Sequence, residues 1–323
     1  MRHCLLALVA TTIAWPALAD PMPSWRDTDT KARIVAFVDA VTDPASPDHV
    51  APADRIAVFD NDGTLWAEKP VYFQLLYALD RLQKMAADDP SILTTDALKA
   101  AAAGDMQALA ATGEHGLLEV IGATHSGMSV DAFIADAADW LATATHPGTG
   151  LRYAQMTYAP MIELLGYLRD EGFATYIVSG GGVHFIRAFS QDAYGIPPEQ
   201  VIGSVGESAY ELVDGVPTLV KKPGIAFIDD KEGKPVGIDR GIGKRPILAV
   251  GNSDGDFQML EWTTASAGAR LGVLIHHTDA DRAFAYDRDS AVGSLARGLD
   301  EGPDRGWVIV DMKADWDRVW TGE

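Results

Sequence analysis

The sequence is poor in cysteine and in basic residues. Its single cysteine, Cys4, lies near the N-terminus, so the rest of the chain must be stabilised by its core and not by disulfides. The chain carries 46 Asp and Glu against 26 Lys and Arg, a formal net charge of −20. This charge repels nucleic acids and anionic lipid surfaces, so neither is an expected partner. It also means that an anionic substrate would need local cations or a metal ion.

The N-terminus lacks an apolar stretch long enough to span a bilayer comfortably. Residues 1–19 read MRHCLLALVATTIAWPALA, with Arg2 and His3 before the apolar stretch and Ala-Leu-Ala at its end. This layout is typical of a secretory signal peptide cleaved after Ala19, and an uncleaved anchor is the alternative. We therefore expect a periplasmic or secreted protein with no stable membrane anchor after cleavage.

Short apolar segments alternate with helical patterns over much of the chain. The predicted strands include residues 55–59, 173–178, 246–250, 271–275 and 306–312, and a hairpin is predicted to turn at Asp214 and Gly215. A helix is expected to begin near residue 279. This alternation predicts an α/β fold, a doubly wound parallel sheet covered on both faces. Residues 67–150 are Ala-rich, with no convincing strand, and predict a helical cap inserted into a core of residues 20–66 and 151–323.

Three polar clusters each follow a predicted strand. They read FDNDGT after residues 55–59, SGGG after 173–178 and GNSDGD after 246–250. Ligands of such sheets bind at the carboxyl ends of the strands, so the clusters predict one site. A calcium loop is the alternative for Asp60 and Asp62, but an EF-hand beginning at Asp60 would have Leu65 in place of its glycine and Val71 in place of its glutamate.

The strand followed by Asp60-x-Asp62-Gly63-Thr64, together with the later clusters in this order, resembles the haloacid dehalogenase (HAD) superfamily. The phosphoserine-phosphatase-like group is the most similar, because its helical cap is inserted between the first and second motifs. The chain also resembles exported acid phosphatases of this group. The resemblance implies a Rossmann-like core, Mg²⁺ as cofactor and a small organic phosphate ester as substrate, hydrolysed through an aspartyl-phosphate intermediate.

The resemblance also implies individual roles. Asp60 would be the nucleophile, and Asp62 would protonate the leaving alkoxide and then deprotonate the water. The dehalogenases of the superfamily lack this second Asp, so its presence favours phosphate chemistry. Ser179 and Gly180 would bind the phosphate through a hydroxyl and a backbone N–H group at a helix start.

A lysine of the third motif is also expected at the phosphate. Lys234 is preferred because it precedes a proline that suits the first turn of a helix, and Lys244 is the alternative. Lys221 and Lys222 are weaker candidates.

The expected Mg²⁺ ligands are the Asp60 carboxylate, the Asp62 carbonyl and Asn252, with Asp256 in support. Asn252 departs from the family, which typically places an Asp at this position. An amide oxygen coordinates Mg²⁺ with less charge, so weaker metal binding is expected. No role is predicted for Asp254.

Glu68 stands close to where phosphoserine phosphatases place a Glu that meets the substrate amine. It is interpreted either as an exposed residue at a helix start or as a recognition residue for phosphocholine, phosphoethanolamine or phosphoserine. Two further functions stay open. One is phosphate transfer to an alcohol acceptor, and the other is a catalytically inactive ligand-binding protein, which the replacement at Asn252 supports. The oligomeric state is not predicted.

Overall fold

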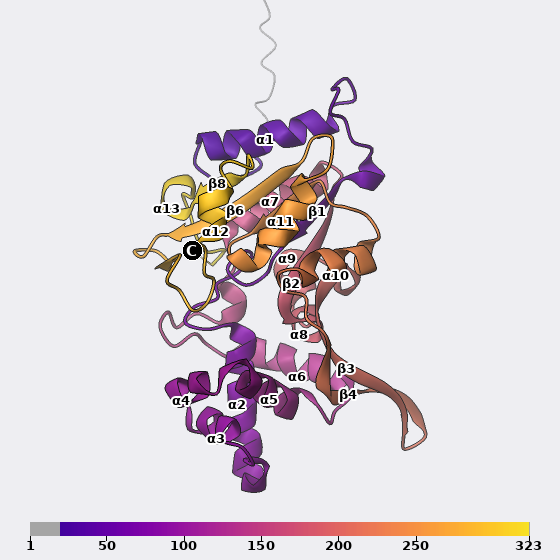
Figure 1. Ribbon diagram of the computed structural model, residues 1–323, viewed down its shortest axis with the longest axis vertical. Helices are drawn as coiled ribbons and strands as arrows, with labels where there is room; N and C mark the ends of the chain where they lie inside the picture. The colour runs from indigo at the N-terminus through magenta and orange to yellow at the C-terminus, as the bar shows by residue number, and fades with distance from the viewer. Residues whose placement is uncertain (1–19, 323) are drawn as a thin grey trace, which may run out of the picture.

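A computed structural model describes residues 20–322, apart from the side chain of Glu114 (Figure 1). The expected signal peptide, residues 1–19, lies outside the described residues. Within residues 20–322, no helix is both long and apolar enough to cross a membrane.

The centre of the described chain is a twisted sheet of mainly parallel strands. Their order is β3 (Val201–Val213), β2 (Ala174–Gly182), β1 (Ile56–Phe59), β5 (Leu248–Gly251), β6 (Leu271–Thr278) and β8 (Val308–Asp311). β4 (Val216–Phe227) pairs antiparallel with β3, and β7 (Ala285–Tyr286) pairs antiparallel with β6. The strand order reverses direction between β1 and β5, which is where parallel sheets bind ligands.

Both faces of the sheet are buried, as the continuous apolar strands predict. Alternate side chains of β1 enter different hydrophobic clusters: Ala57 and Phe59 pack on one face, and Ile56 and Val58 on the other. The first face is covered by α1 (Asp29–Thr42), α7 (Ala159–Asp170), α8 (Val183–Arg187) and α9 (Ser190–Tyr194). The second is covered by α10 (Gly233–Ile242) and α11 (Phe257–Thr264). The predicted α/β fold with a doubly covered parallel sheet is confirmed.

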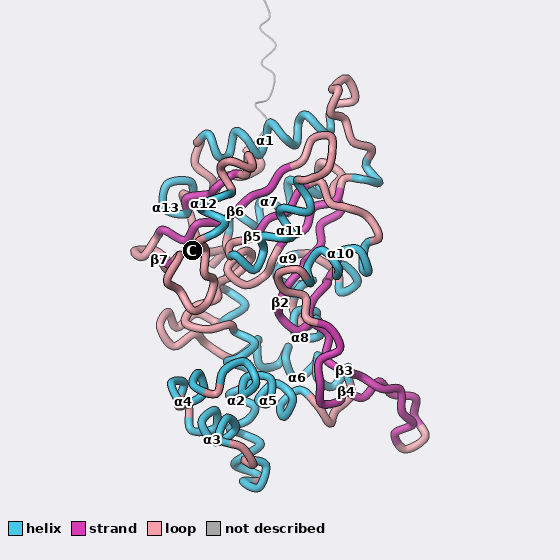
Figure 2. Tube along the Cα trace, viewed as in Figure 1, coloured by secondary structure: helices cyan, strands magenta, loops and turns pink. Residues whose placement is uncertain are grey.

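A group of helices lies between β1 and β2 in the sequence. It comprises α2 (Phe73–Asp88), α3 (Asp96–Ala103), α4 (Met106–Ala111), α5 (Gly113–His125) and α6 (Val130–Thr143). Figure 2 shows α2 to α5 gathered at one end of the molecule, where they enclose their own hydrophobic cluster. α6 instead packs against α8, and Phe133 joins the core of the sheet. The cap boundaries at 67 and 150 therefore stay a prediction.

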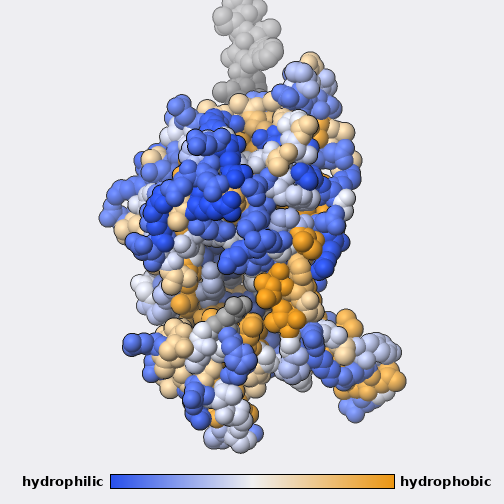
Figure 3. Space-filling view, viewed as in Figure 1, coloured by the Kyte–Doolittle hydropathy of each residue, from blue (hydrophilic) through white to orange (hydrophobic). Residues whose placement is uncertain are grey.

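β3 and β4 form a long arm that projects from the sheet (Figure 1). Asp214 and Gly215 turn the arm with φ angles of 51° and 80°, the left-handed pair of a tight hairpin. Figure 3 shows polar residues over most of this face of the core and apolar residues beside the arm and at its tip. The exposed apolar side chains of the arm are Tyr210, Leu212, Val213, Val216 and Leu219.

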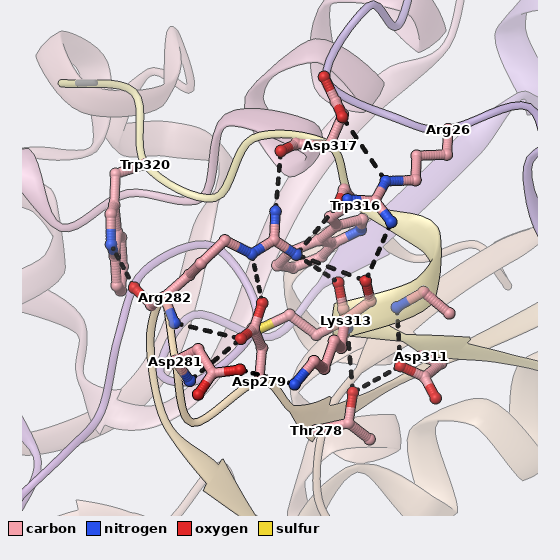
Figure 4. A network of polar contacts seen from close by, with 12 residues as sticks. Arg26, Thr278, Asp279, Asp281, Arg282, Asp311, Lys313, Trp316, Asp317 and Trp320 are labelled. Carbon is pink, nitrogen blue, oxygen red and sulfur yellow. Dashed lines mark hydrogen bonds and ion pairs between the residues drawn. The ribbon is translucent and has the colours of Figure 1, made fainter.

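The predicted helix at residue 279 is wrong. The Asp279 carboxylate accepts backbone N–H groups of Asp281 and Arg282 and closes a turn instead. The Arg282 guanidinium then donates to Asp279 and to backbone carbonyls of the C-terminal segment, among them Trp316 and Asp317 (Figure 4). These contacts bind the turn to the C-terminal segment, which contains α13 (Met312–Asp315), while α12 (Arg297–Glu301) lies between β7 and β8.

Candidate active site

The ends of three neighbouring strands bring the predicted site residues together. Asp60 directly follows β1, Ser179 lies in the last part of β2, and Asn252 directly follows β5. The side chains of all three are largely buried. β1 lies between β2 and β5, so the ladder of backbone hydrogen bonds fixes the spacing of these residues.

Lys234 lies at the centre of this cluster. Its Nζ atom donates to Asp60 Oδ1 at 2.6 Å and to the Val178 carbonyl at 2.8 Å, and it lies 2.7 Å from Asp256 Oδ1. Lys244, the alternative, pairs with Asp54 at the surface. The structure therefore brings Lys234 and not Lys244 to Asp60.

The buried charges shift one another's protonation. Burial is the main reason that the pKa of Asp60 lies well above its usual value; Asp256 raises it further, and Lys234 opposes the rise. Burial also raises the pKa of Asp62. Burial alone would lower the pKa of Lys234, but the carboxylates of Asp256 and Asp60 outweigh it and raise this pKa. Lys234 is therefore a permanent cation at neutral pH.

The turn after β1 is held by contacts on both sides. Trp66 Nε1 donates to Asp62 Oδ1 at 2.9 Å, and His277 Nε2 donates to the Gly63 carbonyl at 2.8 Å. Gly63 has a φ angle of 77°, and a Cβ atom there would collide with the side chains of Asn252 and Glu68. Only glycine fits this turn without strain.

The glycine segment continues β2 up to Gly182, and α8 begins at Val183. Two of its backbone N–H groups have partners within the protein. Gly181 donates to Ser179 Oγ at 3.0 Å, and Gly182 donates to Gln74 Oε1 at 2.7 Å. The amide of Gln74 lies 3.1 Å from His125 Nε2, which links the glycine segment to α2 and α5.

Glu68 is buried, with 2% of its surface exposed, and is not an exposed residue at a helix start. Its Oε1 atom accepts from Asn252 Nδ2 at 2.8 Å and from the Tyr286 hydroxyl at 2.7 Å. Burial raises the pKa of Glu68 to about 8. Asn252 Oδ1 also accepts from the Thr64 hydroxyl at 3.1 Å, so Asn252 connects the loops after β1 and β5.

Asp254 and Asp256 have different surroundings. Asp256 Oδ2 accepts the backbone N–H groups of Asn252 and Ser253, which fixes the loop after β5. The carboxylate of Asp254 points the other way and accepts backbone N–H groups at the start of α12, from Ala296, Arg297 and Gly298. Asp254 therefore anchors α12.

The oxygen atoms at this edge suit a hard divalent cation such as Mg²⁺. Asp60 and Asp256 are buried around a single lysine, and Asp62 adds further negative charge. In residues 20–322, no set of three or more His, Cys, Asp or Glu side chains is arranged to hold a metal ion. The predicted ligand set of the Asp60 carboxylate, the Asp62 carbonyl and Asn252, with Asp256 in support, combines carboxylate, backbone carbonyl and amide oxygens, and it stays a prediction. The Asn252 oxygen keeps a second lone pair beside its bond to Thr64.

A cavity of about 570 Å³ opens onto these residues. Asp60, Asp62, Ser179 and Lys234 are part of its lining. The lining also includes residues of α2, α5, α6, α8, the arm and the segment after it, among them Leu75, Leu117, Leu118, Ile121, Phe133, His184, Lys221, Ile225 and Ile228.

Sequence reasoning missed the residues that support the site. Gln74, Trp66 and His277 each bind a backbone or carboxylate atom of the motifs. His277 packs against the turn after β1, and nothing in the sequence indicates that its ring contacts Gly63. The Tyr194 hydroxyl likewise donates to Asn61 Oδ1 at 3.0 Å from a distant helix.

Comparison with solved structures supports the fold. A conserved protein of unknown function from Anaerococcus prevotii matches with a TM-score of 0.53 and 15% identity, over 80% of this chain and 89% of that chain. A protein of unknown function from Bordetella pertussis matches with a TM-score of 0.49 and 17% identity, over 80% and 98%. A phosphoserine phosphohydrolase-like protein from Francisella tularensis matches with a TM-score of 0.35 and 17% identity, over 77% and 98%. At these identities, the first likeness supports the fold and not an activity.

The search of curated proteins found no match. The family model of the haloacid dehalogenase-like hydrolases matches residues 57–261, from β1 into α11. This range contains Asp60, Ser179, Lys234 and Asn252, and the expected resemblance is confirmed. The chain belongs to the haloacid dehalogenase-like hydrolases.

Proposed function

We propose that this hydrolase is a Mg²⁺-dependent phosphomonoesterase that acts on small organic phosphate esters. The observation that supports it is the buried contact of 2.6 Å between Lys234 and Asp60 at the end of β1, with Asp62 two residues away. A carboxylate attacks a phosphate ester only where cations reduce the repulsion between the two anions. Lys234 provides one such charge, and Mg²⁺ bound by Asp60, the Asp62 carbonyl and Asn252 would provide the other.

The residues divide the reaction between them. An oxygen of Asp60 attacks phosphorus, the ester bond breaks, and the leaving alkoxide takes a proton from Asp62. Asp62 then removes a proton from water, whose oxygen attacks the aspartyl phosphate and restores the Asp60 carboxylate. Lys234 and Ser179 contact phosphate oxygens throughout. Asp256 keeps Lys234 in place, because it binds the same ammonium group.

The test is phosphate release from benzyl phosphate with Mg²⁺ and with EDTA. Asp60→Asn should abolish turnover while the circular dichroism spectrum and melting temperature stay close to wild type. A folded Asp60→Asn variant that works at the wild-type rate would refute the proposal. Glycerol in the assay separates hydrolysis from transfer, since transfer would produce glycerol phosphate in place of part of the inorganic phosphate.

An inactive binding protein would give neither turnover nor heat of Mg²⁺ binding in calorimetry. We also propose export to the periplasm or outside the cell, on the signal-peptide pattern of residues 1–19. Sequencing the N-terminus of the protein isolated from a periplasmic fraction should find Asp20, and Met1 would contradict export with cleavage.

A further inference from the structure

One buried lysine of the cavity takes no part in the proposed phosphate chemistry. Lys221 lies on β4 with 5% of its surface exposed. Its ammonium lies 3.2 Å from His184 Nδ1 and 4.5 Å from the centre of the Phe133 ring. Its backbone is hydrogen-bonded to Gly127 and Met128 in the loop between α5 and α6, and these bonds fix the position of its Cα atom.

Lys221 differs from the other buried lysines of the described chain. Lys31 pairs with Asp20, and Lys234 pairs with Asp60 and Asp256. No carboxylate of the described side chains forms an ion pair with Lys221, and burial lowers its pKa. A buried cation without a counter-ion is costly, and here it occurs in a chain of net charge −20. A ligand that brings a negative charge would remove this cost.

His184 adds a second donor beside Lys221. Its Nδ1 atom accepts from the lysine, so the ring proton sits on Nε2. Burial and the charge of Lys221 lower the pKa of His184 to about 4, so the ring is neutral at pH 7. Neighbouring Lys222 already has a counter-ion, because it pairs with Glu211.

Part of the cavity wall is apolar. This part consists of leucine and isoleucine side chains of α2, α5, the arm and the segment after it, and they are Leu75, Leu117, Leu118, Ile121, Ile225 and Ile228. This wall suits a hydrocarbon or aromatic body, because burying apolar surface is favourable and leaves no polar group unpaired.

We propose that the cavity binds phosphate monoesters whose leaving group combines an apolar body with a second negative charge, and that Lys221 binds this charge. The second anion is a carboxylate or a further phosphate. This proposal rests on the proposed phosphatase function. It differs from the amine recognition expected of Glu68, whose Oε1 atom accepts hydrogen bonds from Asn252 and Tyr286.

Three esters with nearly the same leaving-group chemistry test the preference: benzyl phosphate, 4-carboxybenzyl phosphate and 4-(aminomethyl)benzyl phosphate. In the wild type, kcat/KM for the carboxylate should exceed that for benzyl phosphate by about tenfold, as expected for a charge-assisted hydrogen bond at a buried site. Equal values, or a preference for the amine, would overturn the proposal.

Variants of Lys221 and Lys222 then show which residue causes the preference for the carboxylate ester. In Lys221→Met, the ratio of kcat/KM between the carboxylate and the parent ester should fall to about one, since the charge is lost and the aliphatic stem is kept. Lys221→Arg should keep most of the ratio. Lys222→Met is the matched control, with the same change one residue along the strand, and should keep the wild-type ratio. A ratio that survives in folded Lys221→Met would overturn the assignment.

A binding measurement separates this proposal from the catalytic one. Calorimetry with benzylphosphonate and 4-carboxybenzylphosphonate in the presence of Mg²⁺ needs no turnover. Selective binding of the carboxylate that is lost in Lys221→Met supports the Lys221 site, even if no ester is hydrolysed and the phosphatase proposal fails. Hydrolysis of all esters without selectivity, together with equal phosphonate binding, would refute the Lys221 site and leave the phosphatase proposal standing.

Discussion

Lys234 Nζ and Asp60 Oδ1 lie 2.6 Å apart, and both side chains are buried at the carboxyl end of β1. The same ammonium also pairs with Asp256 from the loop after β5. One cation thus connects α10 to two neighbouring strands of the sheet. Its removal should affect both folding and catalysis.

Lys234→Met leaves two buried carboxylates without their shared counter-ion. We expect the free energy of unfolding in urea to fall by about 3–5 kcal/mol, as when one partner of a buried pair is removed. We also expect kcat/KM for benzyl phosphate to fall by about a hundredfold or more. Lys244→Met, at the surface beside Asp54, should stay within about twofold in kcat/KM and 0.5 kcal/mol in stability. Similar losses in both variants would contradict the assignment.

Asn252→Asp should separate metal binding from apo stability. The new oxygen faces Glu68 Oε1, where the amide now donates at 2.8 Å. Without Mg²⁺ and above about pH 9, where Glu68 with its pKa of about 8 is ionised, the variant should lose about 1–3 kcal/mol of unfolding free energy. Asn252→Asp/Glu68→Gln supplies a donor again and should recover most of that loss. The added carboxylate should tighten Mg²⁺ binding in the double variant by about tenfold. Weaker binding in calorimetry would show that residue 252 is no metal ligand.

Gln74→Ala should reduce activity, although Gln74 supports the glycine segment and does not touch the reacting groups. The variant leaves the Gly182 N–H group without its partner at 2.7 Å and breaks the link to His125. We expect kcat/KM to fall by about tenfold, equivalent to one lost hydrogen bond at a buried group. Gln258→Ala is a suitable control, because that side chain contacts Glu232 on the other face of the sheet. Unchanged kinetics in Gln74→Ala would mean that the glycine segment holds its shape unaided.

Asp279 should make the free energy of unfolding depend on pH. Burial alone would raise its pKa, but the hydrogen bonds from Arg282 outweigh burial and lower the pKa below the usual value. The carboxylate therefore stabilises the fold above the unfolded-state pKa of about 3.9, and this contribution is lost as the pH falls through the folded-state pKa.

Asp279→Asn should lower the free energy of unfolding at pH 7 by about 1–3 kcal/mol, and the difference from wild type should shrink below about pH 4. Urea unfolding at pH 7, 4 and 3 measures this. Asp281 forms an exposed ion pair with Lys313, so Asp281→Asn should change the free energy of unfolding little at any of these pH values. A gap between wild type and Asp279→Asn that is as large at pH 3 as at pH 7 would contradict the assigned pKa direction.

The sequence predicts the sheet well because its strands are short apolar runs that end in polar clusters. The same pattern places Asp60, Ser179 and Asn252 at one edge, since parallel strands share the direction of their carboxyl ends. Local pattern also located the turn of the arm, where Asp214 and Gly215 adopt the left-handed conformation.

Contacts between distant segments were beyond such reasoning. Asp254 anchors α12 from 42 residues away at Ala296, and no periodicity records that partnership. The helix predicted near residue 279 failed for a similar reason, because Arg282 binds carbonyls of the C-terminal segment. From the sequence, Lys221 is only a weaker alternative to Lys234. That its side chain is buried without a counter-ion can be seen only in the three-dimensional structure.

The continuity of β3 has a consequence for substrate choice. This strand pairs with β2 beside Ser179 and then runs out into the arm, where it pairs with the strand that carries Lys221. β3 therefore joins the strand that contains Ser179 to the strand that carries Lys221, with irregularities in register beside Ser179 and between Val205 and Ser208. This connection would fix the distance between Ser179 and Lys221, so the enzyme would select among esters by the distance between their two anionic groups.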